Sequence, residues 1–201
     1  MSDPAIMPRP QLILLARHGA TEWSISGQHT GRTDIALTDS GIRQATAMTP
    51  LLNRLIGDEI PLVYTSPLIR AAETARLALP GWPADLTDAL QEVDYGSLEG
   101  LTHQQIEQQR PKWNLFRDGC PGGESLQQVA ARCDSFIAKL ERVAAGRTVV
   151  VFTHGHLSRI LATRLLALSP EVGDVLHNDT ASIGVIDDKR GRYVLSGWNL
   201  L

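Results

Sequence analysis

The sequence of 201 residues has little cysteine, no long apolar run and no excess of positive charge. Two cysteines, Cys120 and Cys133, are too few for a disulfide scaffold and lack zinc-site spacing, so we expect free thiols in a reducing compartment. Because no run approaches the length of a membrane-spanning helix, no membrane association is expected. The formal net charge of -3 argues against a general attraction to nucleic acid or acidic lipid.

The first ten residues also lack the features of a targeting segment. Met1–Pro10 has no basic start, long apolar stretch or small-residue cleavage site, so we expect a loose arm on a cytoplasmic protein. Hydrophobic residues make up 43% of the chain and charged residues 20%, which is ordinary for a globular protein. The length favours one domain over residues 1–201, as a monomer or homodimer, although two domains would also fit.

Apolar runs of strand length alternate with helical periodicities along the chain. The expected strands are 11–16, 62–65, 84–89, 148–152, 182–186 and 193–198, and the expected helices are 38–56, 66–79, 102–109, 125–145 and 157–168. Segments 23–37, 90–100 and 112–123 are expected to be loops or irregular. The pattern predicts an α/β three-layer sandwich: a mostly parallel sheet with one antiparallel strand and helices on both faces.

Basic side chains stand where the predicted strands end. Arg17 and His18 follow the first strand, His154 follows the Val-rich strand, and Arg70 lies in the first turn of a helix after the second strand. The carboxyl ends of parallel strands meet at one sheet edge, where ligands bind. Since a phosphate monoester carries about -1.5 to -2 charge, these four groups form a plausible phosphate cage.

Transfer of a phosphoryl group also requires a proton donor for the leaving oxygen. The loop from Gln91 to Glu99 offers Glu92, Asp94 and Glu99 as candidates. Glu99 is about as well explained as a solvated carboxylate. If His18 attacks phosphorus, it must be a neutral imidazole, and a backbone carbonyl is the expected partner for its other ring nitrogen.

Four ordered motifs resemble those of the histidine phosphatase superfamily, in its phosphoglycerate-mutase-like branch. They are Arg17-His18-Gly19, Tyr64-Thr65-Ser66-Pro67 leading to Arg70, Glu92 to Gly100, and Thr153-His154-Gly155-His156. The resemblance extends from about Leu12 to about Ile186. Segments 22–31 and 113–120 further resemble a sub-branch with sedoheptulose-1,7-bisphosphatase and bacterial acid phosphatases, which points to sugar phosphates.

The resemblance implies a metal-independent phosphomonoesterase without a cofactor. His18 would become phosphohistidine, Arg17, Arg70 and His154 would bind the phosphoryl group, and Glu92 would act as general acid. The residues that would face the substrate are Ser24, Thr30, Gly31, Tyr95, Gly155, His156 and Thr180. Ser24 and Thr180 stand where the family usually has asparagine, so either oxygens would replace amides there or the phosphate contacts would be fewer.

Two other functions remain as alternatives. A cofactor-dependent phosphoglycerate mutase is disfavoured, because mutases have lysine where His103 stands and an insertion with paired arginines that the segment 111–123 lacks. A non-catalytic protein that binds phospholigands is disfavoured by the presence of both His18 and Glu92.

Several residues have simpler interpretations. A metal site on His154 and His156 is disfavoured, because no acidic ligand motif is nearby. Trp113 and Phe116 are expected to pack a lid, and His103 to lie on a helix surface. His29 and His177 look incidental, and Arg117 suits an anion contact or a surface ion pair equally.

Overall fold

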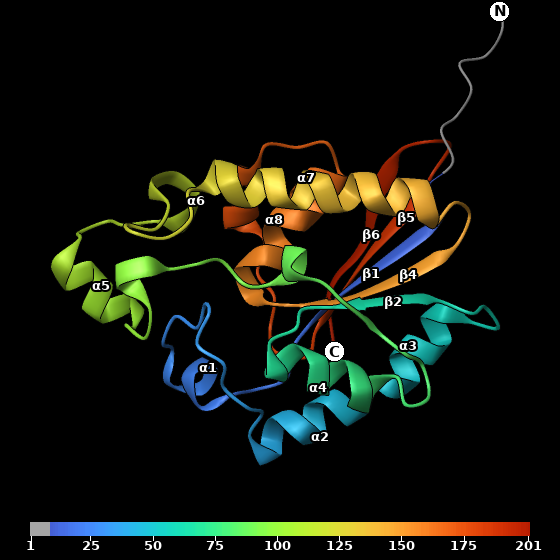
Figure 1. Cartoon of the computed structure of the whole chain (residues 1–201), viewed down its shortest axis with the longest axis horizontal. Helices are drawn as coiled ribbons and strands as arrows, with labels where there is room; N and C mark the ends of the chain where they lie inside the picture. Colours follow the sequence, from blue (N-terminus) through green and yellow to red (C-terminus); the bar gives the residue numbers. More distant parts are fainter. Residues whose placement is uncertain (1–8) are drawn as a thin grey trace, which may run out of the picture.

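The computed structural model describes residues 9–201, and its centre is one six-stranded sheet (Figure 1). The strands are β1 Leu12–Arg17, β2 Leu62–Thr65, β3 Asp85–Leu86, β4 Thr148–Thr153, β5 Ile183–Asp188 and β6 Tyr193–Leu200, in the order β3-β2-β4-β1-β5-β6. Strands β1 to β4 are parallel, and β5 runs antiparallel to both neighbours. The predicted α/β fold with one antiparallel strand is confirmed.

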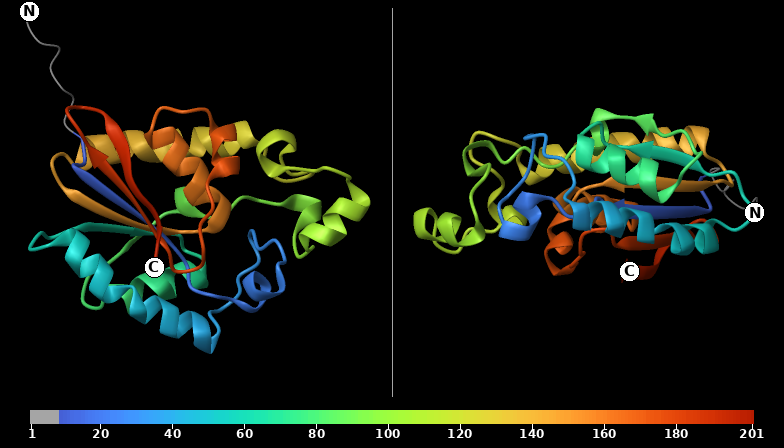
Figure 2. Two further views of the ribbon diagram at one scale, coloured as in Figure 1. Left: turned by 180° about the vertical axis from the view of Figure 1, so that it is seen from behind. Right: turned by 90° about the horizontal axis from the view of Figure 1, so that it is seen from below.

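Helices cover both faces of this sheet (Figures 1 and 2). The helices are α1 Glu22–Ser26, α2 Asp39–Ala47, α3 Thr49–Ile56, α4 Ile69–Ala78, α5 His103–Gln109, α6 Leu115–Asp118, α7 Leu126–Val143 and α8 Gly155–Leu165. Short 3₁₀ turns span Asp88–Leu90, Gly96–Leu98 and Pro170–Val175. Helices α7 and α8 lie over one face, and α2, α3 and α4 over the other. None of these helices is long and apolar enough to cross a membrane.

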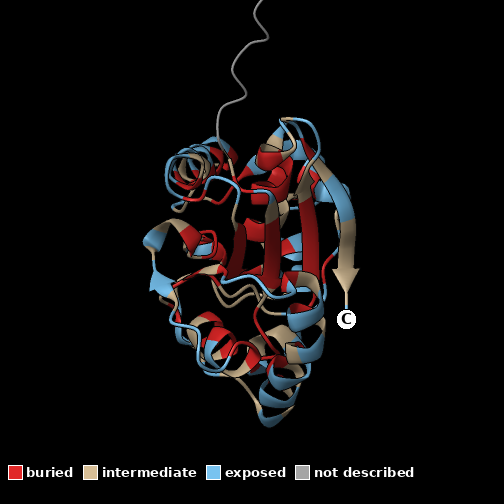
Figure 3. Ribbon diagram, turned by 90° about the vertical axis from the view of Figure 1, so that its right-hand side faces the viewer, coloured by how far each residue is buried: buried red, intermediate tan, exposed pale blue. Residues whose placement is uncertain are grey.

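The period of two along β1 and β4 explains the two cores. Ile13 and Leu15 of β1 belong to the core under α7 and α8, whereas Leu14 and Ala16 belong to the core over α3 and α4. Successive strand side chains point to opposite faces, so a strand covered on both faces must be apolar throughout. All six residues of β4 are buried, and the central strands are the most buried part of the molecule (Figure 3).

Two predicted helices differ from the structure, one in its continuity and one in its start, and both differences involve proline. The helix expected over 38–56 is interrupted at Met48, and Pro50 lies in the first turn of the separate helix α3, where its missing N–H costs nothing. Helix α4 begins at Ile69 rather than at Pro67, because Leu68 is still extended. The Ile69 N–H instead donates to Asp34 Oδ1 over 2.7 Å, so a distant loop caps this helix.

Two segments expected to be irregular contain short helices. The segment 23–37 contains most of α1. Thr21 and Ser24 form the capping box that starts this helix, and Gly27 ends it in the left-handed region. Within 112–123, the Asn114 side chain caps α6. Helix α8 begins two residues before the predicted start, with His154 as its N-cap.

The predicted loose arm falls mostly on residues 1–8, which lie outside the described residues. For Arg9 and Pro10 the prediction is wrong. Pro10 is buried, Arg9 accepts a hydrogen bond from Gly146 N over 2.8 Å, and its guanidinium lies 5.0 Å from the centre of the Tyr193 ring. Cys120 and Cys133 are free, as expected, and both are buried.

The turn that follows β1 is held by a close contact between two glycines. A Cβ on Gly19 would lie 2.4 Å from Gly41 O, and a Cβ on Gly41 would lie 2.1 Å from Ala20 O. Real Cβ atoms do not approach backbone so closely, so the start of α2 sits directly against the segment that carries His18. The Thr74 side chain accepts from Gly19 N over 3.0 Å and holds the other side of this turn.

We predict that Gly41→Ala lowers the free energy of unfolding by about 1–3 kcal/mol, because the new methyl group overpacks this contact. Urea denaturation measures the change. Arg43→Ala, on the exposed face of the same helix, is the matched control and should stay within about 0.5 kcal/mol of the wild type. Equal stability of the two variants would contradict the packing described here.

Candidate active site

The sheet order brings the predicted basic residues together at one edge. Strands β1 and β4 are neighbours, with Arg17 opposite Thr153, so the residues that follow them, His18 and His154, are also adjacent. Their ring centroids lie 5.3 Å apart. Strand β2, on the other side of β4, leads into α4, which contributes Arg70. The carboxyl ends of three parallel strands therefore converge on one site.

His18 is held as one defined tautomer. It is 5% exposed, and its Nδ1 lies 2.7 Å from Gly19 O. A carbonyl oxygen only accepts hydrogen bonds, so Nδ1 carries the proton and Nε2 keeps its lone pair. Burial, followed by the charges of Arg17 and Arg70, lowers the pKa of His18 well below its usual value. The imidazole is therefore neutral, and its Nε2 is free to attack. The Gly19 carbonyl is the backbone partner that the sequence predicted for the other ring nitrogen.

His154 has the opposite tautomer. Arg70 Nε donates to His154 Nδ1 over 3.1 Å, and because a guanidinium only donates, the His154 proton must be on Nε2. This Nε2 is buried without a hydrogen-bond partner in the described residues. Burial is the main cause that lowers the pKa of His154, so the ring stays neutral and offers one unused N–H.

The two arginines are fixed by backbone carbonyls. Arg70 is fully buried and donates to the carbonyls of Thr30, Gly31 and Thr33 over 2.8–3.2 Å. Arg17 Nη1 donates to Asn178 O over 2.7 Å, and its Nε is buried without a partner within residues 9–201. Burial is the main cause that lowers the pKa of both groups. Unused buried donors beside His18 are the arrangement expected around an anion.

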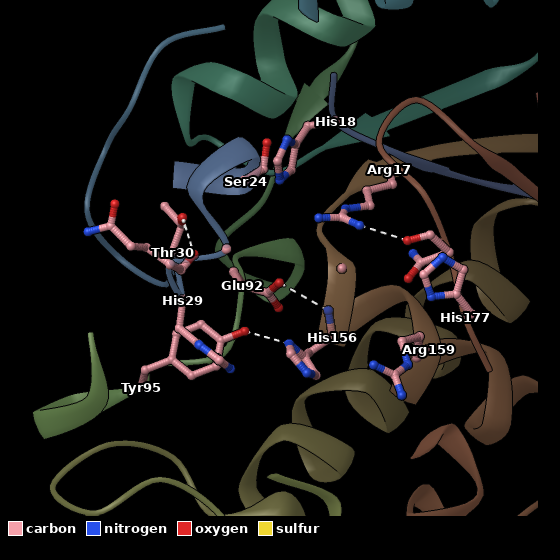
Figure 4. Close-up of a pocket in the computed structure, with 14 residues that line it drawn as sticks. Arg17, His18, Ser24, His29, Thr30, Glu92, Tyr95, His156, Arg159 and His177 are labelled. Carbon is pink, nitrogen blue, oxygen red and sulfur yellow. Dashed lines mark hydrogen bonds between the residues drawn. The ribbon is translucent and has the colours of Figure 1, made fainter. Parts of the chain in front are cut away.

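Glu92 lies on the opposite side of the site at the start of α8 (Figure 4). Its Oε1 accepts from Val93 N and Leu157 N, both over 2.9 Å, and its Oε2 accepts from His156 N over 3.0 Å. The side chain is 4% exposed. Arg132, which is paired with Glu124, donates to the carbonyls around Glu92 and fixes this loop.

These groups meet at a cavity of about 260 Å³ beyond the strand ends (Figure 4). Eight residues predicted from the sequence line it: Arg17, His18, Ser24, Thr30, Glu92, Tyr95, Gly155 and His156. Arg70 and His154 are not among the residues that line the cavity, but the His154 ring lies beside that of His18, which does line it. The lining also includes residues that the sequence did not single out as site residues: Gly27, Gln28, His29, Arg159, His177 and Asn178.

The structure does not bring two of the expected substrate-facing residues into the cavity. Gly31 packs against the site from outside: its N–H donates to the Glu99 carboxylate over 2.9 Å, and a Cβ there would lie 2.5 Å from Val93 O. Thr180 lines a second cavity beside α2, because the chain reverses at Ala181, whose φ is 60°. Asn178, two residues earlier in the chain, lines the active-site cavity instead.

Other expectations also change. His29 and His177 are not incidental, since both line the cavity. The Ser24 hydroxyl is engaged in the α1 capping box, where it accepts from Thr21 N over 2.8 Å. Glu99 holds the 31–33 loop through backbone N–H groups. Trp113 and Phe116 are buried.

The remaining alternatives lie away from the cavity. His103 is exposed at the start of α5, and Arg117 pairs with Asp118. Within residues 9–201 no three His, Cys, Asp or Glu side chains are grouped so as to hold a metal ion.

The fold and site are those of an enzyme that handles phosphate esters, and comparison with known proteins identifies the family. Residues 13–201 match the model of the histidine phosphatase superfamily (branch 1), so the chain belongs to this superfamily. It is a phosphatase, as are the two relatives in sequence that are described next.

The chain is 42% identical to an acid phosphatase of Mycobacterium tuberculosis, with 91% of this chain and 89% of that protein covered. It is 32% identical to sedoheptulose 1,7-bisphosphatase of Saccharomyces cerevisiae, with 95% and 79% covered. A solved structure of an open reading frame from Mycobacterium tuberculosis superposes with a TM-score of 0.90 at 41% identity, covering 96% of this chain and 98% of that one.

The buried neutral histidines predict a dependence of stability on pH. The pKa values of His18, His154 and His156 are lowered from 6.5, mainly by burial, so below about pH 6.5 the unfolded chain binds protons that the folded chain does not. These histidines therefore do not reduce the free energy of unfolding above this pH. As the pH decreases below it, each histidine lowers the free energy of unfolding by up to about 1.4 kcal/mol per pH unit. Denaturation at pH 7.0 and pH 5.5 measures this loss, and unchanged stability over that interval would contradict the assignment.

Proposed function

We propose that this protein hydrolyses small phosphate monoesters through phosphorylation of His18. The observation that carries the proposal is the pair of unused buried donors, Arg17 Nε and His154 Nε2, beside the free Nε2 of His18. A phosphoryl group in that position would accept both hydrogen bonds. Fixed donors of this kind stabilise charge in the transition state without having to reorganise.

In the proposed first step, the His18 Nε2 lone pair forms a bond to phosphorus while the ester P–O bond breaks. Glu92, in its protonated form, gives its proton to the leaving alkoxide, which departs as an alcohol. In the second step Glu92 takes a proton from water as the water oxygen attacks phosphorus, and the N–P bond breaks. His18 then has its lone pair back and inorganic phosphate leaves, so no metal or cofactor enters either step.

The proposed substrates are sugar phosphates. This is supported by the likeness to sedoheptulose 1,7-bisphosphatase and by a cavity lined mainly by polar side chains. Relatives also include phosphoglycerate mutases, for example one from Methylobacterium sp. that is 36% identical over 80% of this chain and 83% of that protein. We disfavour the mutase alternative, because His103 stands outside the cavity and none of the lining residues is a lysine.

We also propose that the protein acts as one domain, as a monomer or homodimer in the cytoplasm, without nucleic acid. Two buried free thiols are consistent with a reducing compartment.

The test is hydrolysis of an aryl phosphate and an alkyl phosphate in excess chelator. We expect turnover of both by the wild type, and none by His18→Asn. Glu92→Gln should slow the alkyl ester, which needs protonation, by about 10²–10⁴-fold, and the aryl ester far less.

His103→Asn is the control, because this exposed histidine lies outside the cavity. Loss of wild-type activity in chelator would contradict the proposal. Equal slowing of the two esters by Glu92→Gln would remove Glu92 from the role of acid.

A further inference from the structure

Two histidines in the wall of the active-site cavity have unused ring nitrogens of opposite character. His29 and His156 both line the cavity, and their rings are nearly parallel, with centroids 5.9 Å apart and planes inclined by 18°. Neither Nε2 has a hydrogen-bond partner in the described part of the chain, and neither belongs to the fully buried polar atoms. Both nitrogens are therefore available to a molecule in the cavity.

The tautomer of His29 follows from its backbone contact. Its Nδ1 lies 3.1 Å from Leu101 O, and a carbonyl only accepts, so Nδ1 carries the proton. Burial lowers the pKa of His29, which leaves the ring neutral and its Nε2 as an acceptor. The rings of Tyr95 and Trp113 meet His29 edge-on with centroids 5.0 and 5.5 Å away, so the imidazole is fixed in orientation.

The tautomer of His156 follows from Tyr95. Tyr95 is 2% exposed, and its hydroxyl lies 2.6 Å from His156 Nδ1 and has no other partner among residues 9–201. A buried hydroxyl proton is satisfied only if it is donated to that nitrogen. His156 Nδ1 is then the acceptor, and the single proton of the neutral ring is on Nε2. His156 therefore presents a donor beside the acceptor of His29.

We propose that His29 and His156 together bind a hydroxyl group of the substrate's leaving alcohol. A hydroxyl both donates and accepts, so it can give its proton to His29 Nε2 and accept from His156 Nε2. A second phosphate or a carboxylate only accepts and would leave His29 unsatisfied, and an apolar group would satisfy neither ring.

The position of the pair also fits the leaving group. The backbone N–H of His156 donates to Glu92, the proposed acid, and both residues line the cavity, so His156 flanks the carboxyl that would protonate the leaving oxygen (Figure 4). The pair therefore recognises a hydroxyl near the ester linkage, which defines the substrates as polyol phosphates. This inference rests on the proposed phosphatase function.

The test compares glycerol 1-phosphate with propyl phosphate, which lacks the hydroxyls. We expect the wild type to favour glycerol 1-phosphate in kcat/KM by about 10-fold or more, and His29→Phe and His156→Phe each to reduce that preference by about 5- to 10-fold. Phenylalanine keeps the ring packing and, at position 156, the backbone N–H to Glu92. His103→Asn should keep the full preference.

Turnover of an aryl phosphate distinguishes a variant that is misfolded from one that has lost only its preference for the hydroxyl group. Aryl phosphate turnover within about twofold of the wild type shows that a variant is folded and its phosphoryl site intact. If both phenylalanine variants fold poorly, Tyr95→Phe decides, because it releases the His156 proton while keeping both imidazoles, and it should lower the preference.

Two results would overturn the inference. They are a wild type without preference, and a preference retained in the folded variants, whether or not the activity on both alkyl esters falls equally. Each of these leaves the proposed phosphatase function standing. Absence of aryl phosphate turnover in the wild type would overturn that function and this inference together.

Discussion

A fully buried guanidinium beside two neutral imidazoles is the feature on which the site depends. Among residues 9–201 Arg70 has no carboxylate as a hydrogen-bond partner and instead donates to three backbone carbonyls and to His154 Nδ1. Desolvated positive charge of this kind attracts an anion strongly. The same contact forces the His154 proton onto Nε2, and the charge of Arg70 helps to keep His18 neutral. The buried charge of Arg70 therefore favours both the binding of an anion and the unprotonated form of the nucleophile, His18.

The surrounding fold serves to keep these groups in place. The register of β1 with β4 sets His18 next to His154, while the Gly19–Gly41 contact and the Thr74 hydrogen bond hold the turn between strand and helix. On the other side, three backbone N–H groups fix the Glu92 carboxyl, and Arg132 fixes its loop. A chemical step that needs its groups within fractions of an ångström gains from such rigid support.

Much of this arrangement could be predicted from the sequence, because it depends on local signals. Apolar runs that end in Arg17-His18 and Thr153-His154 define strands and the residues at their carboxyl ends. Asn178, Arg159 and His29 were missed, since their places in the wall depend on how loops from distant parts of the chain pack. Likewise, no local signal places Asp34 at the start of α4, or reverses the chain at Ala181 and so turns Thr180 toward the second cavity.

The ring nitrogen that becomes phosphorylated is the most direct test of this account. Because Gly19 O holds His18 Nδ1, the phosphoryl group should form its bond to His18 Nε2 and to no other histidine. Rapid quenching under alkaline conditions during turnover, followed by ³¹P NMR and peptide mapping, identifies that atom. The account predicts an Nε2-phosphohistidine at position 18. Phosphate on Nδ1 of His18, or on His154, would contradict it.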